Sequence, residues 1–235
     1  MEDGYLAVDL ETTGLDPKTD KIIEIGAARI LSGKVKETYE TFVNPYRKLG
    51  EKVISLTGIS DGQLENAPGI QDVILSFLDF AGNLPLLGHN VIFDYSFLKR
   101  AAVNQGSCFE RRGIDTLSLA RRFMPAEEKK NLKAACDFWG VRQEFTHRAL
   151  ADALAAHELY QKLKALRERE VPEVFSPKPL LYKVKKEQPA SKRQKEYLQD
   201  LLKYHKIALS MQTEYLSRNE ISRITDKIIA QYGRI

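Results

Sequence analysis

Two carboxylates at the end of the first apolar segment constrain this chain more than any other feature. The segment runs from Tyr5 to Leu10, and Asp9 and Glu11 stand two positions apart where it ends. Side chains alternate across a strand, so both acids point to one face and Leu10 points to the other. The pattern predicts a buried strand whose end carries either a solvated acidic face or a functional pair of acids.

Two later blocks of the sequence contain further acidic residues, one of them accompanied by a histidine. Asp94 lies within the run HNVIFDYSFL (residues 89–98), and His147 and Asp152 begin and end the run HRALAD (residues 147–152). Together with DLETTG at residues 9–14, these runs resemble the three sequence blocks of the DEDDh, or DnaQ-like, family of 3′ to 5′ exonucleases. This family includes the proofreading epsilon subunit of bacterial DNA polymerase III. The resemblance covers roughly residues 5–166.

The resemblance implies a metal-dependent site. Hydrolysis of a phosphodiester requires charge to be stabilised on the attacking and leaving oxygens, and two divalent ions supply this. Oxygen ligands suit Mg²⁺ or Mn²⁺ better than zinc. The implied ligands are four carboxylates, those of Asp9, Glu11, Asp94 and Asp152. His147 is the implied general base, since histidine titrates near neutral pH. Many relatives carry a second acid where this chain has Ala151, but that acid is not a ligand in the family.

The resemblance also implies contacts with the substrate. The candidate residues are Thr12, Thr13, Gly14, Leu15, Ile59, His89, Asn90 and Phe93. For Leu15 and Ile59, plain packing is an equally good interpretation. His89 and Asn90 either contact substrate or fix a turn. Asp115 is expected to be structural and to cap the helix that follows it.

Hydrophobic periodicity predicts the fold class. Strands are expected over residues 5–10, 21–31, 35–43 and 84–88 and before residue 117, and helices over residues 70–81, 94–105, 117–124, 131–139 and 148–167. Strands first, then strands alternating with helices, predict an α/β protein with a mixed sheet flanked by helices. This agrees with the ribonuclease H-like fold that the resemblance implies.

The sequence predicts three successive parts of the chain. Residues 1–170 are expected to form the exonuclease domain, residues 171–190 a proline-rich linker, and residues 191–235 a small basic helical module. Capping boxes at Ser191 and Ser217 predict its two helices. Residues 171–235 carry 13 Lys+Arg against 7 Asp+Glu, whereas residues 1–170 carry 23 against 25. We expect the module either to hold nucleic acid or a partner, or to pack on the main domain.

The sequence also predicts in which compartment the protein works. No apolar run approaches the roughly 20 residues of a membrane helix, and the start, MEDG, is acidic rather than signal-like. We therefore expect a cytoplasmic protein that does not contact membranes. Cys108 and Cys136 are expected to be ordinary thiols, since a single pair in a chain of 235 residues is no disulfide framework.

The leading hypothesis is a metal-dependent exonuclease that releases nucleoside monophosphates from 3′ ends of single-stranded DNA, in proofreading or repair. An RNA-trimming exoribonuclease of the same family is the alternative, because no motif reports recognition of a 2′-hydroxyl. A catalytically silent nucleic-acid-binding protein is a third hypothesis, and the complete set of acids argues against it. A DNA polymerase or another replication protein is a candidate partner, although the enzyme acting alone fits the sequence equally well.

Overall fold

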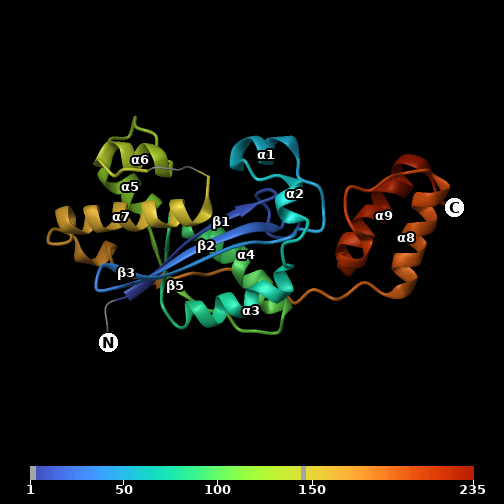
Figure 1. Ribbon diagram of the computed structural model, residues 1–235, viewed down its shortest axis with the longest axis horizontal. Coiled ribbons are helices and arrows are strands. Elements are labelled where there is room, and N and C mark those ends of the chain that lie inside the picture. Colours follow the sequence, from blue (N-terminus) through green and yellow to red (C-terminus); the bar gives the residue numbers. More distant parts are fainter. Residues whose placement is uncertain (1–3, 144–146) are drawn as a thin grey trace.

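A six-stranded mixed sheet with helices on both faces forms the main body of the protein (Figure 1). The computed structural model describes residues 4–143 and 147–235. The strands are β1 (Gly4–Thr12), β2 (Ile22–Leu31), β3 (Lys34–Phe42), β4 (Leu86–Gly88), β5 (Arg112–Asp115) and β6 (Lys178–Pro179). Their order in the sheet is β3-β2-β1-β4-β5-β6. The predicted α/β fold class is confirmed.

The sheet is antiparallel on one side and parallel in the middle. β1 pairs with β2, and β2 with β3, as antiparallel neighbours, whereas β4 runs parallel to both β1 and β5. β1 lies in the interior of the sheet, and its residues 5–8 are buried. A strand covered on both faces has to be apolar on both faces, which explains the unbroken apolar run at the start of the sequence.

Helices cover the two faces of the sheet. The described helices are α1 (Glu51–Thr57), α2 (Asp61–Leu64), α3 (Ile70–Ala81), α4 (Val91–Asn104), α5 (Thr116–Phe123), α6 (Leu132–Trp139), α7 (Ala149–Arg167), α8 (Lys192–Tyr204) and α9 (Arg218–Tyr232). The helices α5, α6 and α7 share one apolar cluster with Tyr5 and Ala7 of β1. The helices α3 and α4 share a second cluster with Leu6, Val8 and Leu10. Alternate residues of β1 therefore face opposite helical layers.

Three sequence expectations need correction. The helix expected from Asp94 begins at Val91, because Asn90 has a left-handed backbone (φ 73°) and serves as its N-cap residue. The helices α1 and α2 were not predicted, since segments of seven and four residues are too short to show helical periodicity. The segment 171–190 is not all linker: a 3-10 turn at Pro172–Val174 and strand β6 lie within it.

The proline-rich segment contributes to the main body. Lys178 and Pro179 pair with Gly113 and Arg112 at the edge of the sheet, where a proline is tolerated. Phe175 is buried, and the Tyr160 hydroxyl donates a hydrogen bond of 3.1 Å to its carbonyl oxygen. The chain thus stays on the sheet until Pro179, and residues 180–190 lead to the C-terminal helices.

The helices α8 and α9 form a separate pair at one end of the molecule (Figure 1). Both begin with the predicted capping boxes, at Ser191 and Ser217. They enclose their own apolar cluster, centred on Leu198, Leu201 and Ile221. In residues 4–143 and 147–235, no helix combines the length and apolar composition needed to cross a membrane.

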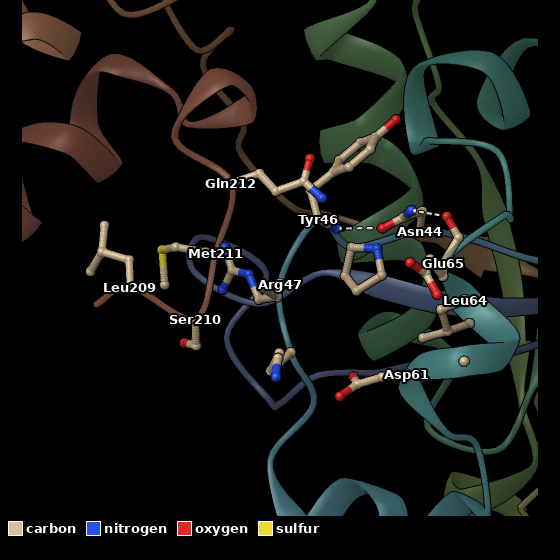
Figure 2. A pocket seen from close by; sticks show the side chains of 13 residues that line it. Asn44, Tyr46, Arg47, Asp61, Leu64, Glu65, Leu209, Ser210, Met211 and Gln212 are labelled. Carbon is tan, nitrogen blue, oxygen red and sulfur yellow. Dashed lines mark hydrogen bonds between the residues drawn. The ribbon is translucent and has the colours of Figure 1, made fainter. Parts of the chain in front are cut away.

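Backbone pairing joins this module to the main body. The Lys48 amide donates to the Ser210 carbonyl (2.7 Å), and the Gln212 amide donates to the Tyr46 carbonyl (2.9 Å). The Tyr46 ring stacks on that of Tyr215, with centroids 3.5 Å apart. A cavity of about 430 Å³ lies between this contact and α2, and Figure 2 shows Asn44 bridging Tyr46 and Glu65 along its wall.

Candidate active site

Acids from β1 and α7 meet at one end of the sheet. Asp9 and Glu11 share the strand face of Tyr5 and Ala7, which is the face that α7 covers. Asp152 stands in the first turn of α7. Among the described residues, Glu11, His147 and Asp152 each offer a possible metal-ligand atom within 4.8 Å of those of the other two. Strand alternation and the position of α7 therefore create a compact acidic cluster.

Asp94 joins the cluster from the opposite helical layer. It lies in the first turn of α4 and is buried. The amide of Leu10 donates a hydrogen bond of 3.1 Å to its Oδ1. This bond fixes the start of α4 to the end of β1. The carboxylates of Asp9 and Asp94 repel each other, and the carboxylates of Glu11 and Asp152 also repel that of Asp9.

The acids are held in an environment that disfavours their negative charge. Burial, followed by repulsion from Asp94, Asp152 and Glu11, raises the pKa of Asp9 well above its usual range. Burial, followed by repulsion from Asp152, raises the pKa of Glu11 to about 7. Burial also raises the pKa values of Asp94 and Asp152. Such a cluster gains stability from a cation, and its oxygen ligands fit Mg²⁺ or Mn²⁺.

Stability without divalent ions should fall as the pH rises. The pKa of Glu11 is about 7 in the folded protein and 4.5 ordinarily, so the folded state retains a proton that the unfolded chain releases between these values. The free energy of unfolding in chelator should therefore decrease across this window, by on the order of 3 kcal/mol for Glu11. Urea denaturation across the same pH range measures this. Glu11→Gln should flatten the dependence, and an equal slope in that variant would contradict the assignment.

Hydrogen bonds from the loop before α7 fix the position of the Asp152 side chain. His147 is exposed and has a left-handed backbone (φ 60°), and its amide donates a hydrogen bond of 3.0 Å to Asp152 Oδ2. The side-chain amide of Gln143 donates to Asp152 Oδ1. Residues 144–146 lie outside the described part of the chain. Gln143 was not among the residues expected at the site.

Glu24 of β2 is a second residue that the sequence reasoning missed. Its carboxylate is fully buried and accepts hydrogen bonds from Arg148 Nε (3.0 Å), Arg148 Nη2 (2.9 Å) and the Ala149 amide (3.1 Å). It also lies opposite Glu11 in the pairing of β1 with β2. Glu24 thus holds the start of α7 beside β1, and Asp152 is positioned as a result. The available signal was an acid inside the apolar run IIEIGA at residues 22–27.

The corner after Glu11 is fixed by hydrogen bonds within its own loop. The Thr12 hydroxyl donates to the Gly14 carbonyl (2.7 Å), and Thr13 Oγ1 accepts from the Lys21 amide (2.9 Å). Leu15 is 84% exposed, so it has no packing role in the described structure. Ile59, by contrast, is 1% exposed and belongs to a cluster with Ile23, Leu49 and Leu64, which favours the packing interpretation.

The turn before α4 is also bonded internally. His89 Nδ1 lies 3.0 Å from Thr116 Oγ1, and its Nε2 lies 2.7 Å from the Lys130 carbonyl oxygen. Burial lowers the His89 pKa. The Asn90 amide donates to Asp115 Oδ1 (2.8 Å), which also accepts from the Leu117 amide (3.0 Å). Asp115 therefore caps α5 as predicted, and His89 fixes the turn. Phe93 is half-buried, and its ring centroid lies 5.0 Å from that of Phe97.

A ribonuclease H-like sheet with acids from β1, α4 and α7 gathered at one end defines a DnaQ-like nuclease. The sequence model of the RNase T family, described as exonuclease, matches residues 6–160, and the chain belongs to this family. The DEDDh resemblance is thereby confirmed.

Curated relatives agree with this assignment. The chain is similar to the PolC-type DNA polymerases III of Caldanaerobacter subterraneus subsp. tengcongensis (38% identity over 163 residues) and Bacillus subtilis (35% over 164 residues). Both matches cover 69% of this chain but only 12% and 11% of those relatives.

Two solved structures share the fold. One is the zinc-bound E. coli ExoI complex with single-stranded DNA, with a TM-score of 0.66 and 18% identity over 74% of this chain and 43% of that one. The other is exonuclease X with 5′ overhanging duplex DNA, with a TM-score of 0.58 and 22% identity over 73% and 99%.

Proposed function

We propose that this protein is a metal-dependent 3′ to 5′ exonuclease that releases nucleoside monophosphates from single-stranded DNA ends, in proofreading or repair. The observation that carries the proposal is the buried acidic cluster at the end of β1, which Glu11 and Asp152 share with His147. The DNA polymerase names of the relatives and the DNA bound in the similar structures support DNA as the substrate.

The four carboxylates of Asp9, Glu11, Asp94 and Asp152 would hold two Mg²⁺ or Mn²⁺ ions. Bound there, the ions would stabilise negative charge on the attacking and leaving oxygens. The raised pKa of Glu11, about 7, supports the proposal, because burial and repulsion between acids are relieved by a cation. The protein contributes the fixed positions of these acids, through Glu24 at α7 and the Leu10 amide at α4.

The remaining residues would act on the water and the terminal nucleotide. His147 is exposed beside Glu11 and Asp152, where its imidazole can take a proton from the attacking water. Leu15 is exposed four positions beyond Glu11, which suits contact with the terminal base. Thr12, Thr13 and Gly14 would shape the corner that receives the 3′ nucleotide.

Digestion of labelled oligonucleotides tests the proposal. A DNA strand labelled at its 5′ end should give a ladder that shortens stepwise from the 3′ end in Mg²⁺ or Mn²⁺ and should be untouched in chelator. An RNA strand of equal sequence is the comparison. Faster cleavage of RNA would favour the exoribonuclease alternative, and no cleavage of either strand in any metal would contradict the proposal.

His147→Ala should slow hydrolysis by about 10² to 10⁴-fold, the usual contribution of a general base. Single-turnover rates on saturating DNA measure this, and added imidazole should restore part of the lost rate because it can enter the space of the missing ring. His205→Ala, in the C-terminal module, is the matched control and should keep the wild-type rate. A His147→Ala enzyme with an unchanged rate would remove His147 from the base role.

A role beside a DNA polymerase is a further part of the proposal. The match spans only 12% and 11% of the two PolC-type relatives, and the matched region there belongs to a polymerase chain. We propose that the exonuclease acts on ends that a polymerase has extended. Adding the protein to a primer extension by a proofreading-deficient polymerase should lower the error frequency, and an Asp9→Ala protein should not.

A further inference from the structure

A basic groove lies where the segment after β6 passes between α4 and α9. The cavity measures about 1030 Å³ and contains many cationic side chains along its walls. We define the basic groove by five exposed cations, Lys18, Lys183, Lys185, Lys186 and Arg223. None of these five forms an ion pair within residues 4–143 and 147–235. The other cations of the lining, Lys99 and Arg100, are already paired with Glu110 and Glu187.

The extended segment turns its lysines outward. Tyr182 and Val184 are half-buried, and Lys183 and Lys185 between and after them are exposed, as the alternation of an extended chain requires. Tyr182 packs against the apolar cluster of α3 and α4. The segment is then held at Glu187, whose amide donates to Asn104 Oδ1 of α4 (3.0 Å). The lysines are therefore presented from a fixed backbone.

The opposite wall of the basic groove is formed by α9, which a buried carboxylate attaches to the main body. Glu220 of α9 is 6% exposed and forms ion pairs with Lys21 (2.9 Å) and Arg47 (3.0 Å) of the main body. Arg223 follows one helical turn later, and its Nη2 lies 3.5 Å from the Lys18 carbonyl oxygen. The ion pairs of Glu220 thus hold Arg223 next to the loop that carries Lys18.

The basic groove lies close to the candidate active site along the chain. Lys18 is four residues beyond Gly14, a span of at most roughly 14 Å. The exposed Leu15 lies between them. The helix α4 also connects the two regions, since Asp94 is in its first turn and Arg100 lines the groove. A strand whose 3′ end occupies the acidic cluster can therefore continue toward the groove.

We propose that the basic groove binds the phosphate backbone of the single-stranded substrate upstream of the nucleotide being removed. This inference rests on the proposed function and adds a binding surface in which four of the five cations lie outside the matched exonuclease region and Lys18 lies within it. Five cations on two walls, none of them in an ion pair with another described residue, can contact successive phosphates without reading bases. The basic side chains of α8 are less available for such contacts, because Lys192 pairs with Glu196 and Lys195 donates to the Glu214 carbonyl.

A charge-reversal pair of variants tests the proposal. The groove variant is Lys183→Glu, Lys185→Glu and Lys186→Glu. The control variant is Lys192→Glu, Arg193→Glu and Lys203→Glu, which changes the net charge equally on exposed positions of α8. Fluorescence anisotropy in chelator measures binding of an oligothymidine of about 24 nucleotides, longer than the usual site of a single-strand binder, over a range of salt concentrations. Circular dichroism checks the fold of each protein.

The groove variant should bind the long strand at least about tenfold more weakly, and its salt slope should fall by about 2, since each lost phosphate contact removes about 0.7. Arg223→Gln, on the other wall, should weaken binding by about threefold. The control variant should change affinity by less than about twofold. Equal losses in the groove and control variants, or no loss in the groove variant, would overturn the proposal.

Two further measurements separate this proposal from the proposed function. A duplex of the same length serves as a second ligand, and an equal loss of duplex and single-strand binding would show a general polyanion surface and overturn the proposal. Cleavage in Mg²⁺ is compared on strands of about 24 and about 4 nucleotides, where the ratio of kcat/KM for long over short strands should fall in the groove variant. Wild-type protein that binds but never cleaves would contradict the proposed function alone.

Discussion

Asp9→Ala is expected to reduce exonuclease activity by about 10³-fold or more, because the proposed metal site would lose one of its ligands and with it several kcal/mol of transition-state stabilisation. Asp9 interacts with Asp94, Asp152 and Glu11, so its loss affects the whole cluster. Initial rates on 5′-labelled DNA in saturating Mg²⁺ measure the effect. Asp79→Ala, on the exposed side of α3, is the control and should be fully active. Activity above a few per cent in a folded Asp9→Ala protein would contradict the metal assignment.

The same substitution should raise stability when metal is removed. Burial and four neighbouring acids raise the pKa of Asp9, so folding costs additional free energy at any pH above the ordinary pKa of an aspartate. Alanine removes the cost, and Tm in chelator at neutral or higher pH should increase. In saturating Mg²⁺ the order should reverse, since only the wild type gains stability from the bound ions. A Tm that falls equally in both conditions would indicate a simple packing defect.

Gly26→Ala is the second substitution with a large expected effect. A Cβ at residue 26 would lie 2.0 Å from the Leu150 amide nitrogen and 2.2 Å from the Ala149 carbonyl carbon. Both are backbone atoms, so the start of α7 has to move away from β2, and Asp152 moves with it. A displacement of about 1 Å at a catalytic group costs about 10² in rate, and overpacking costs about 1–3 kcal/mol.

Rates on labelled DNA and urea denaturation measure these two losses. Gly62→Ala is the matched control, because its new methyl group would meet no atom within 4 Å, and it should keep wild-type activity. If Gly26→Ala retained full activity, the close approach of β2 to α7 would not control the position of Asp152. If it lost stability but kept its rate, Asp152 would be held by contacts other than those of α7 with β2.

Much of the main fold followed from short-range patterns. The apolar runs of β1 and β2 and the helical spacing of α3 depend on residues only a few positions apart, so they are visible without the tertiary structure. The capping boxes at Ser191 and Ser217 are equally local and were predicted correctly. The short helices α1 and α2 and the two-residue strand β6 were not predicted, because each is too short to show a period.

The candidate site residues also fall into those that local patterns predict and those that they do not. Strand alternation determined that Asp9 and Glu11 share one face, since that depends on a spacing of two residues. The identities of Asp94, His147 and Asp152 came from the family resemblance. Gln143 and Glu24 were missed, because their contacts with Asp152 and α7 join segments whose proximity no local pattern reports.

The sequence by itself determined the conformation of the longer elements and the shared face of Asp9 and Glu11, because backbone geometry and side-chain alternation act over a few residues. The tertiary structure alone decided where those acids meet. Glu24 and Arg148 are separated by 124 positions, and only the packing of α7 on β2 brings their side chains within 3.0 Å. The basic groove has the same origin, because Arg223 and Lys18 are 205 positions apart and become neighbours through the ion pairs of Glu220. Contacts between distant segments depend on the whole folded chain, so their geometry is absent from any local pattern in the sequence.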